Sequence, residues 1–129
     1  MKERIKDFVK STGLSVADIR NYETDWVVEN QSGEIVGYSG VERRGNYVYI
    51  QSLAVKRNYR GWGIGRKLVE NAYDYINEGD TLIALTLFWN NGFYRKCGFK
   101  KLNAKEIKKQ DDVAGRTKHK YCVAWGKEK

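Results

Sequence analysis

Hydrophobic and polar residues alternate through much of the first half of the chain. Residues 34–43 alternate, with Ile35, Gly37, Ser39 and Val41 set against Val36, Tyr38, Gly40 and Glu42. Residues 25–29 are a short strand-like run, and residues 47–55 form a longer run rich in β-branched and aromatic residues. Turn-forming residues occupy 30–33 and 44–46 between these runs. Alternation with period two is typical of half-buried strands. The pattern therefore predicts three strands joined as an antiparallel meander.

Helical periodicity flanks this meander. Residues 3–10 carry Ile5, Phe8 and Val9 on one face of a predicted helix, and a second helical stretch is expected over residues 15–22. After the meander, apolar residues recur at steps of three and four from 63 to 77, which predicts an amphipathic helix.

The segment that follows this helix is almost entirely apolar. Residues 81–86 read Thr-Leu-Ile-Ala-Leu-Thr, a composition typical of a strand buried on both faces and paired in parallel. Strand 47–55, the helix and strand 81–86 therefore form a predicted βαβ unit. Further along we expect a helix over 91–97, a strand over 99–102, a polar helix over 104–112 and a last strand over 118–125.

Length and composition limit the class of protein. The 129 residues are 41% hydrophobic and 31% charged, which predicts one folded domain spanning 1–129. No apolar stretch is long enough for a membrane span, and the N-terminus lacks the apolar core of a signal peptide, so we expect a cytoplasmic protein. With one histidine and two widely separated cysteines, no metal site is expected, and Cys97 is predicted to be a small buried apolar side chain.

The net charge of +8 favours anionic partners. A nucleic acid is one candidate and a nucleotide cofactor with several phosphates is another. A basic surface that serves only solubility is the alternative to both.

A glycine-rich segment, Arg60-Gly61-Trp62-Gly63-Ile64-Gly65, joins strand 47–55 to the amphipathic helix. Free backbone N–H groups and the helix dipole at such a junction bind anions, and Arg60 and Arg66 can add charge-assisted bonds. The spacing matches neither the P-loop nor the dinucleotide-binding fingerprint. A glycine turn that only redirects the chain is the alternative interpretation.

The context of this segment resembles the signature of the GNAT superfamily of acyl-CoA-dependent N-acyltransferases. That signature is Arg/Gln-x-x-Gly-x-Gly/Ala after a strand ending in Leu-Ala-Val, and it is matched by 53–55 followed by Arg60, Gly63 and Gly65. A second motif, residues 93–99, is similar to the family's Phe-Tyr-x-x-x-Gly-Phe. The resemblance covers residues 25–102 and looks closest to short amino-acid N-acetyltransferases of the N-acetylglutamate synthase type.

This resemblance implies an α/β (α+β) fold. The central sheet would be mixed but mostly antiparallel and flanked by helices, with a splayed parallel strand pair forming the acetyl-CoA cleft. A bulge near Ser52 or Leu53 would open the two strands. Acetyl-CoA would be the co-substrate, without a metal. The implied cofactor-binding residues are Leu53, Ala54, Val55, Arg60, Gly61, Trp62, Gly63, Ile64, Gly65, Arg66 and Asn90, with Asn91 as an alternative to Asn90.

The implied chemistry is direct attack of an amine on the thioester. Tyr94 occupies the family's general-acid position, with aromatic packing as the alternative role. Glu42 is our candidate base, and the alternatives are a surface ion pair of Glu42 with Arg43 or Arg44, or a water chain to backbone carbonyls that would replace it as base.

The acceptor is expected to be the primary amine of a small molecule. Arg43 and Arg44 favour a carboxylate-bearing acceptor such as an amino acid or analogue, while protein N-termini and polyamines stay open. Other classes are a basic nucleic-acid-binding module and a CoA sensor without catalysis, although we expect no nucleic-acid or membrane partner. The family's habit suggests a homodimer.

Overall fold

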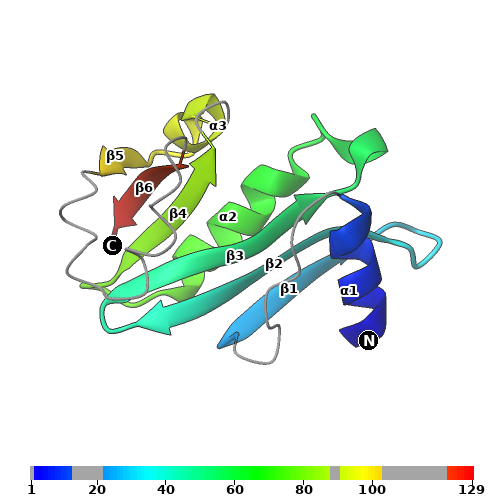
Figure 1. The fold of residues 1–129 in the computed structure, drawn as a ribbon, viewed down its shortest axis with the longest axis horizontal. Coiled ribbons are helices and arrows are strands. Elements are labelled where there is room, and N and C mark those ends of the chain that lie inside the picture. The colour runs from blue at the N-terminus through cyan, green and yellow to red at the C-terminus, as the bar shows by residue number, and fades with distance from the viewer. Residues whose placement is uncertain (1, 13–21, 88–90, 103–121) are drawn as a thin grey trace.

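The computed structural model describes residues 2–12, 22–87, 91–102 and 122–129. All described strands belong to one six-stranded sheet with the order β1-β2-β3-β4-β6-β5 (Figure 1). The elements in chain order are α1 (Lys2–Ser11), β1 (Thr24–Glu29), β2 (Ile35–Arg44), β3 (Tyr47–Val55), the 3-10 turn η2 (Arg57–Tyr59), α2 (Ile64–Tyr75), β4 (Thr81–Leu87), α3 (Asn91–Lys96), β5 (Lys100–Leu102) and β6 (Cys122–Glu128).

The predicted strand pattern of the first half is confirmed. β1, β2 and β3 pair as an antiparallel meander, and β3 pairs with β4 in parallel after the α2 crossover. The central residues of β4 are buried as expected, since Leu82, Ile83 and Ala84 lie between β3 and β6. Hydrophobic period alone was enough to place this βαβ unit.

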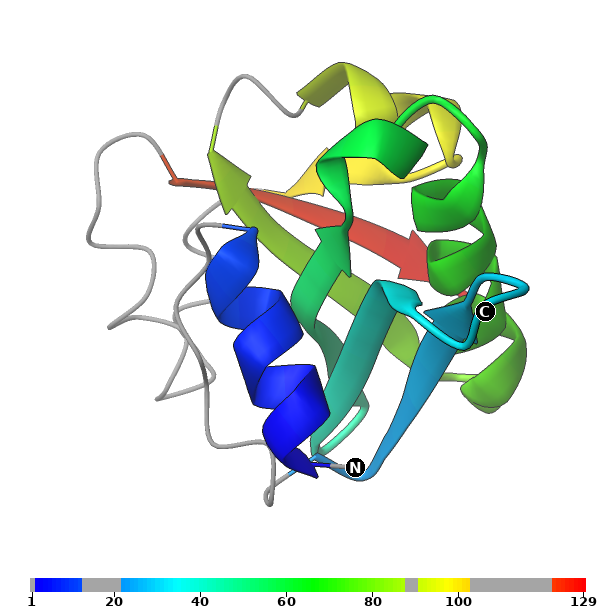
Figure 2. The ribbon, with the colours of Figure 1, turned by 90° about the vertical axis from the view of Figure 1, so that its right-hand side faces the viewer.

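Helices cover both faces of the sheet (Figure 2). α1 packs on one face, where Phe8 and Val9 contact Tyr38 and Ala54 in one apolar cluster. α2 and α3 lie on the other face, over a larger cluster that is centred on Trp125. Because the two layers are built from different strand positions, each side chain of β2 and β3 belongs to one layer or the other.

Two glycines determine where α2 lies. Gly63 caps the helix with φ 83°, so the helix begins at Ile64 rather than at 63 as predicted. Gly37 on β2 faces this first turn, and a Cβ there would come within 2.6 Å of the Ile64 side chain. The helix ends at Tyr75, two residues before the predicted end, because Ile76 is already extended.

The predicted last strand over 118–125 ends too early. β6 runs from Cys122 to Glu128, and its polar end pairs with the start of β4, whereas residues 118–121 lie outside the described residues. Gly126 supplies the reason, since it leaves room for Leu102, which would lie 2.7 Å from a Cβ at that position. The predicted polar helix 104–112 lies outside the described residues, as does the predicted helix 15–22 apart from Tyr22, and η2 was not predicted.

The parallel pairing of β3 and β4 is short. It joins Tyr47 to Thr81, Val48 to Leu82 and Tyr49 to Ile83, whereas the two strands continue to Val55 and Leu87. Figure 1 shows the two strands diverging beyond this point. We call residues 51–55 of β3 and 84–87 of β4 the open end of the strand pair. No helix in the described part of the chain is both long and apolar enough to cross a membrane.

Candidate functional site

The loop between η2 and α2 is built from left-handed glycines. Gly61 has φ 90° and Gly63 has φ 83°, a region that costs other L-residues about 1–2 kcal/mol. A Cβ on either glycine would meet nothing within 4 Å. These glycines are therefore required by the backbone conformation, and the space above them is open.

The N-terminus of α2 has no side-chain cap. Gly63 makes no capping side-chain hydrogen bond, and the first turn holds no acidic residue. The N–H groups of Ile64, Gly65 and Arg66 precede the first intrahelical hydrogen bond, which Lys67 donates to Gly63. No acidic side chain of the first turn therefore offsets the positive end of the helix dipole. Such an end favours a bound anion.

Gly65 differs from the two loop glycines. It is helical, and a Cβ there would lie 3.4 Å from the ring of Phe93, an ordinary contact. α2 thus meets α3 at this residue, which brings the two sequence motifs of the resemblance side by side.

The side chains around the loop extend away from it. Arg60 Nε donates to the carbonyl of Val55 over 3.4 Å, and Arg66 Nε donates to Glu70 over 3.2 Å, one turn further along α2. Trp62 is 74% exposed and its ring contacts Tyr59 at 5.4 Å between centroids. An anion bound at this loop would therefore be held mainly by the backbone amides, since the arginine side chains already make hydrogen bonds to other groups.

The expected bulge lies on β3. Tyr38 pairs with Ala54 and Gly40 pairs with Gln51, so β3 carries one more residue than β2 across this interval. Ser52 adopts φ 56° there. Next to it, Leu53 packs in the α2–α3 cluster while Ala54 is buried under α1.

Tyr94 is buried in the same cluster as Leu53. Its side chain is 6% exposed and lies between the rings of Phe93 and Phe99, at centroid distances of 5.0 and 5.4 Å. The predicted aromatic packing is thus observed, and it coexists with a position beside the bulge. Burial raises the pKa of the Tyr94 hydroxyl well above its ordinary value.

Glu42 lies on the opposite face of the sheet. It pairs with Tyr49, the last residue of β3 that pairs with β4, so it stands one strand away from the point where the open end begins. Its carboxylate accepts from Arg44 over 3.0 Å and from Gln51 over 3.2 Å. The predicted ion pair is therefore present, and Gln51 joins Glu42 to the open end.

Arg43 is engaged elsewhere. It donates to Asp80 over 3.0 Å and to Glu23 over 3.2 Å. These contacts lie at the end where residues 47–49 of β3 pair with residues 81–83 of β4, which we call the closed end of the strand pair. Of the two arginines expected to favour a carboxylate, only Arg44 lies on the face of Glu42. Asn90 lies outside the described residues, and the side chain of Asn91 is likewise not described.

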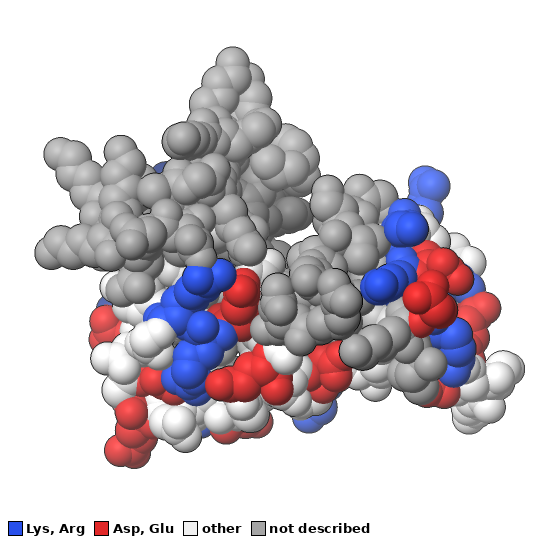
Figure 3. Space-filling view, turned by 60° about the horizontal axis from the view of Figure 1, so that its bottom comes forward, with Lys and Arg blue, Asp and Glu red and all other residues white. Residues whose placement is uncertain are grey.

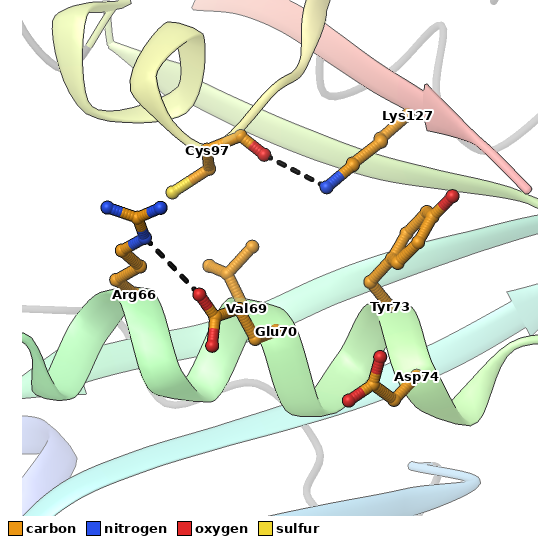
Figure 4. Close-up of a pocket in the computed structure, with 7 residues that line it drawn as sticks. All are labelled: Arg66, Val69, Glu70, Tyr73, Asp74, Cys97 and Lys127. Carbon is orange, nitrogen blue, oxygen red and sulfur yellow. Dashed lines mark hydrogen bonds and ion pairs between the residues drawn. The ribbon is translucent and has the colours of Figure 1, made fainter.

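Two pockets lined by described residues lie away from the open end. One, of about 220 Å³, lies between α2, the end of α3 and β6, and Figure 4 shows Arg66, Tyr73, Cys97 and Lys127 around it. Lys127 closes it by donating to the carbonyl of Cys97 and lying 4.2 Å from the Tyr73 ring centroid. The other, of about 440 Å³, lies at the edge formed by β5 and β6.

Cys97 corrects a prediction. It is half-buried rather than fully buried, since it packs against the edge of the α2–α3 cluster and also lines the first pocket, and burial raises the pKa of its thiol. Among the described residues, no three His, Cys, Asp or Glu side chains are grouped to hold a metal ion.

The comparison that decides the family is with domain families. Residues 21–101 match the acetyltransferase (GNAT) domain, a range that includes the bulge, the glycine loop and the whole of the Phe93–Phe99 motif. This chain belongs to the GNAT acetyltransferase family. A curated relative from Chlorobaculum tepidum, named as an uncharacterised N-acetyltransferase, is 32% identical over 89 residues that make up 68% of this chain. The chain spans 57% of the length of that relative.

Solved structures of GNAT proteins have the same fold. An acetyltransferase of the GNAT family from Staphylococcus aureus Mu50 has a TM-score of 0.72 and 18% identity, covering 98% of this chain and 91% of its own. The N-acetylglutamate synthase of Neisseria gonorrhoeae, in complex with coenzyme A and N-acetyl-glutamate, has a TM-score of 0.77 and 15% identity, covering 97% of this chain and 32% of its own. The mixed sheet with a splayed parallel pair is thus the GNAT fold.

Proposed function

We propose that this chain is an acetyl-CoA-dependent N-acetyltransferase that acetylates the primary amine of a small molecule, an amino acid or a close analogue. The observation that carries the proposal is one strand, β3, which leaves β4 at Tyr49, bulges at Ser52 and leads through η2 into the open glycine loop. A thioester between the diverging strands would thus lie on the same backbone as an anion site for its pyrophosphate. The synthase similar to this chain binds coenzyme A and an acetylated amino acid, which supports this assignment.

The backbone supplies the cofactor contacts in this proposal. Amides from Gly61 to Arg66 would bind the pyrophosphate, since Gly61 and Gly63 leave the approach open. Beyond Tyr49, no residue of β3 pairs with β4. The pantetheine arm would pair there with backbone groups of Leu53 and Val55, and it would displace Arg60 Nε from the carbonyl of Val55. Backbone N–H groups here would also stabilise the oxyanion formed by attack on the thioester.

Proton transfer is assigned to two side chains on opposite faces of the sheet. Tyr94 would protonate the departing thiolate. Burial raises its pKa, which keeps the hydroxyl protonated at neutral pH but makes it a weaker acid than a free tyrosine, so its proton would move only as negative charge develops on the sulfur. Glu42 would accept the proton of the amine. The two side chains lie on opposite faces of the sheet, so the sheet would separate the acid from the base and prevent direct proton transfer between them.

The acceptor assignment rests on the Glu42–Arg44 pair. Their charged groups lie 3.0 Å apart on one face, an arrangement that matches the ammonium and carboxylate of an α-amino acid. In the complex, Arg44 would exchange its bond to Glu42 for one to the acceptor carboxylate.

The charge distribution favours this assignment over a nucleic-acid-binding module. Among the described residues on the face in Figure 3, lysine and arginine side chains lie next to aspartate and glutamate side chains. Binding along a phosphate backbone needs contiguous positive charge.

The test is a thiol-release assay with acetyl-CoA across amino acids, amino-acid amides, polyamines and peptides. We expect turnover with one or a few amino acids and much slower turnover with their amides. Glu42→Gln should lower kcat, and Arg44→Gln should raise KM for the amino acid. Glu34→Gln is the matched control for Glu42, because Glu34 also pairs with a cation, Lys56, but lies on the exposed surface.

Three outcomes contradict parts of the proposal. Equal turnover of acids and amides would refute the carboxylate assignment. Wild-type rates in Glu42→Gln would refute the base. Tight acetyl-CoA binding without thiol release on any amine would instead identify a CoA sensor. That residues 1–129 form one domain, and that the protein is a homodimer, stay predictions.

A further inference from the structure

Ser52 has an unusual backbone conformation. With φ 56°, it is the one non-glycine residue at positive φ in the described part of the chain. Serine gains nothing from this region, which strongly favours glycine. Such a residue persists only where its surroundings hold it, and strained residues of this kind concentrate at functional sites.

Tyr22 contacts Ser52 directly. The Tyr22 hydroxyl and Ser52 Oγ lie 2.7 Å apart in a part-buried hydrogen bond between residues thirty positions apart in the chain. The ring of Tyr22 rests on Gly40 of β2, where a Cβ would come closer than 3.0 Å to three of its ring carbons. The ring can therefore pack here only because residue 40 has no side chain, and this packing places the Tyr22 hydroxyl beside Ser52.

The contact lies where the strand pair opens. Gly40 pairs with Gln51, the residue before Ser52, whereas the pairing of β3 with β4 has ended at Tyr49. On this stretch β3 has a strand neighbour on one side only. The hydrogen bond from Tyr22, which packs on one face of the sheet, thus restrains the backbone of β3 at a position where β4 no longer does.

We propose that Tyr22 is a positioning residue for acyl transfer, which acts through its hydrogen bond to Ser52 to hold the bulge in place. This inference rests on the proposed function, because the bulge matters to catalysis only if the thioester lies against it. Tyr22 touches neither the thioester nor the amine in this scheme. Its effect is on the direction of the backbone N–H groups at 52–53 that face the thioester oxygen.

The proposal has a consequence that a purely structural role lacks. Acetyl-CoA has a thioester carbonyl and CoA does not, while both share the pyrophosphate and pantetheine. Loosening the bulge should therefore slow turnover and weaken acetyl-CoA binding more than it weakens CoA binding.

The experiment compares Tyr22→Phe, Ser52→Ala and the double variant by calorimetric titration with acetyl-CoA and, separately, CoA. Tyr22→Phe keeps the ring on Gly40 and removes only the hydroxyl, and Ser52→Ala removes the same bond from its other end. Each single variant should weaken acetyl-CoA binding by about fivefold, the usual worth of one hydrogen bond. The double variant should lose no more than either single one, because both delete one contact.

Tyr75→Phe is the matched control. Its hydroxyl donates to Glu23 over 2.6 Å, so this variant also removes a phenol hydrogen bond, but at the closed end of the strand pair. It should change neither ligand's affinity. Ser52→Gly is the second variant that separates strain from positioning, since glycine adopts φ 56° freely. It should melt no lower than wild type and still lose acetyl-CoA affinity.

Equal losses for CoA and acetyl-CoA, or additive losses in the double variant, would overturn the proposal. If the wild type binds both ligands but acetylates no amine, the catalytic assignment fails while the titrations still decide whether Tyr22 positions the bulge. If the wild type binds neither ligand, both proposals are refuted.

Discussion

The two halves of β3 differ in what holds them. Residues 47–50 lie beside β2 on one side, residues 47–49 pair with β4 on the other, and Val48 and Tyr49 are almost fully buried. Residues 51–55 have lost the pairing with β4, contain a bulge and carry the positive φ of Ser52. One strand thus passes from a rigid core into an open backbone within a few residues.

The closed end is also held by charge. Arg43 on β2 donates to Asp80, which precedes β4 and also accepts the N–H of Asn77 over 2.9 Å. These bonds connect β2, the end of α2 and the start of β4. The proposed site therefore lies at the end of β3 that has fewer strand contacts. Dense packing and ion pairs at the other end stabilise the fold, which compensates for the backbone of residues 51–55 that does not pair with β4.

The largest effect should come from the open end. Tyr94→Phe should lower kcat about 100-fold, the usual contribution of a general acid, with little change in the KM for acetyl-CoA. Because burial raises the pKa of Tyr94, and activity needs the protonated hydroxyl, the loss of kcat at alkaline pH should begin above the ordinary tyrosine pKa of about 10. Thiol-release kinetics at neutral pH measure the loss of kcat in the variant. A wild-type kcat that does not fall up to pH 10 is the expected result of the second test, and a fall below pH 10 would contradict it.

Tyr73→Phe is the control for this prediction. Tyr73 donates to the carbonyl of Glu128 over 3.0 Å on the exposed side of α2. Equal kcat values for the Tyr94 and Tyr73 variants would show that Tyr94 contributes only packing, and they would refute its assignment as the general acid.

A second prediction compares two glycines with nearly equal backbone angles. Gly61 has φ 90° and Gly79 has φ 91°, and a Cβ on either would meet nothing within 4 Å. Alanine should therefore lower the free energy of unfolding by about 1 kcal/mol at both sites. Only Gly61→Ala should weaken acetyl-CoA binding, by about tenfold in titration, because Gly79 belongs to the closed end. Equal binding by both variants would remove the loop from the site.

The third prediction concerns the closed end. The N–H of Asn77 and the guanidinium of Arg43 hold the pKa of Asp80 below its ordinary value. A depressed carboxyl stabilises the fold fully above its unfolded pKa of about 4, and this stabilisation is lost as pH falls through the lower folded value. Asp80→Asn should therefore melt a few degrees lower at pH 7, with the difference shrinking toward pH 3, and retain wild-type KM for acetyl-CoA. Calorimetric melts across this range test it; a melting difference that does not shrink toward pH 3, or a raised KM, would contradict it.

The smallest effect is expected at Gly65. Its φ is ordinary and a Cβ would make only a normal contact with Phe93, so alanine should fold as well as wild type or slightly better. If a phosphate approaches its amide closely, KM for acetyl-CoA should still rise two- to threefold. An unchanged KM would assign Gly65 to helix packing alone.

Sequence patterns predicted most of the fold. The meander, the crossover and the parallel pair follow from a change of hydrophobic period that local side chains encode directly. The end of β6 was missed because its polar residues are stabilised by contacts with residues distant in the chain, Leu102 beside Gly126 and Tyr73 beside Lys127. The 3-10 turn at 57–59 has no buried residue and so leaves no hydrophobic signal.

The candidate site divides in the same way. The glycine loop could be read from the chain, since Gly61 and Gly63 are required where they stand by the backbone angle alone. The partners of Glu42 and the contact of Tyr22 with Ser52 could not be read, because they join residues that no periodic pattern relates.

The sequence by itself determined the βαβ frame, the loop and the family signature, which all depend on residues near one another in the chain. Only the tertiary structure decided that β3 parts from β4 at Tyr49, that Glu42 and Tyr94 lie on opposite faces, and that Arg43 serves the closed end. Register and side-chain pairing across strands depend on the packing of whole layers, and this is fixed only when all strands are in place.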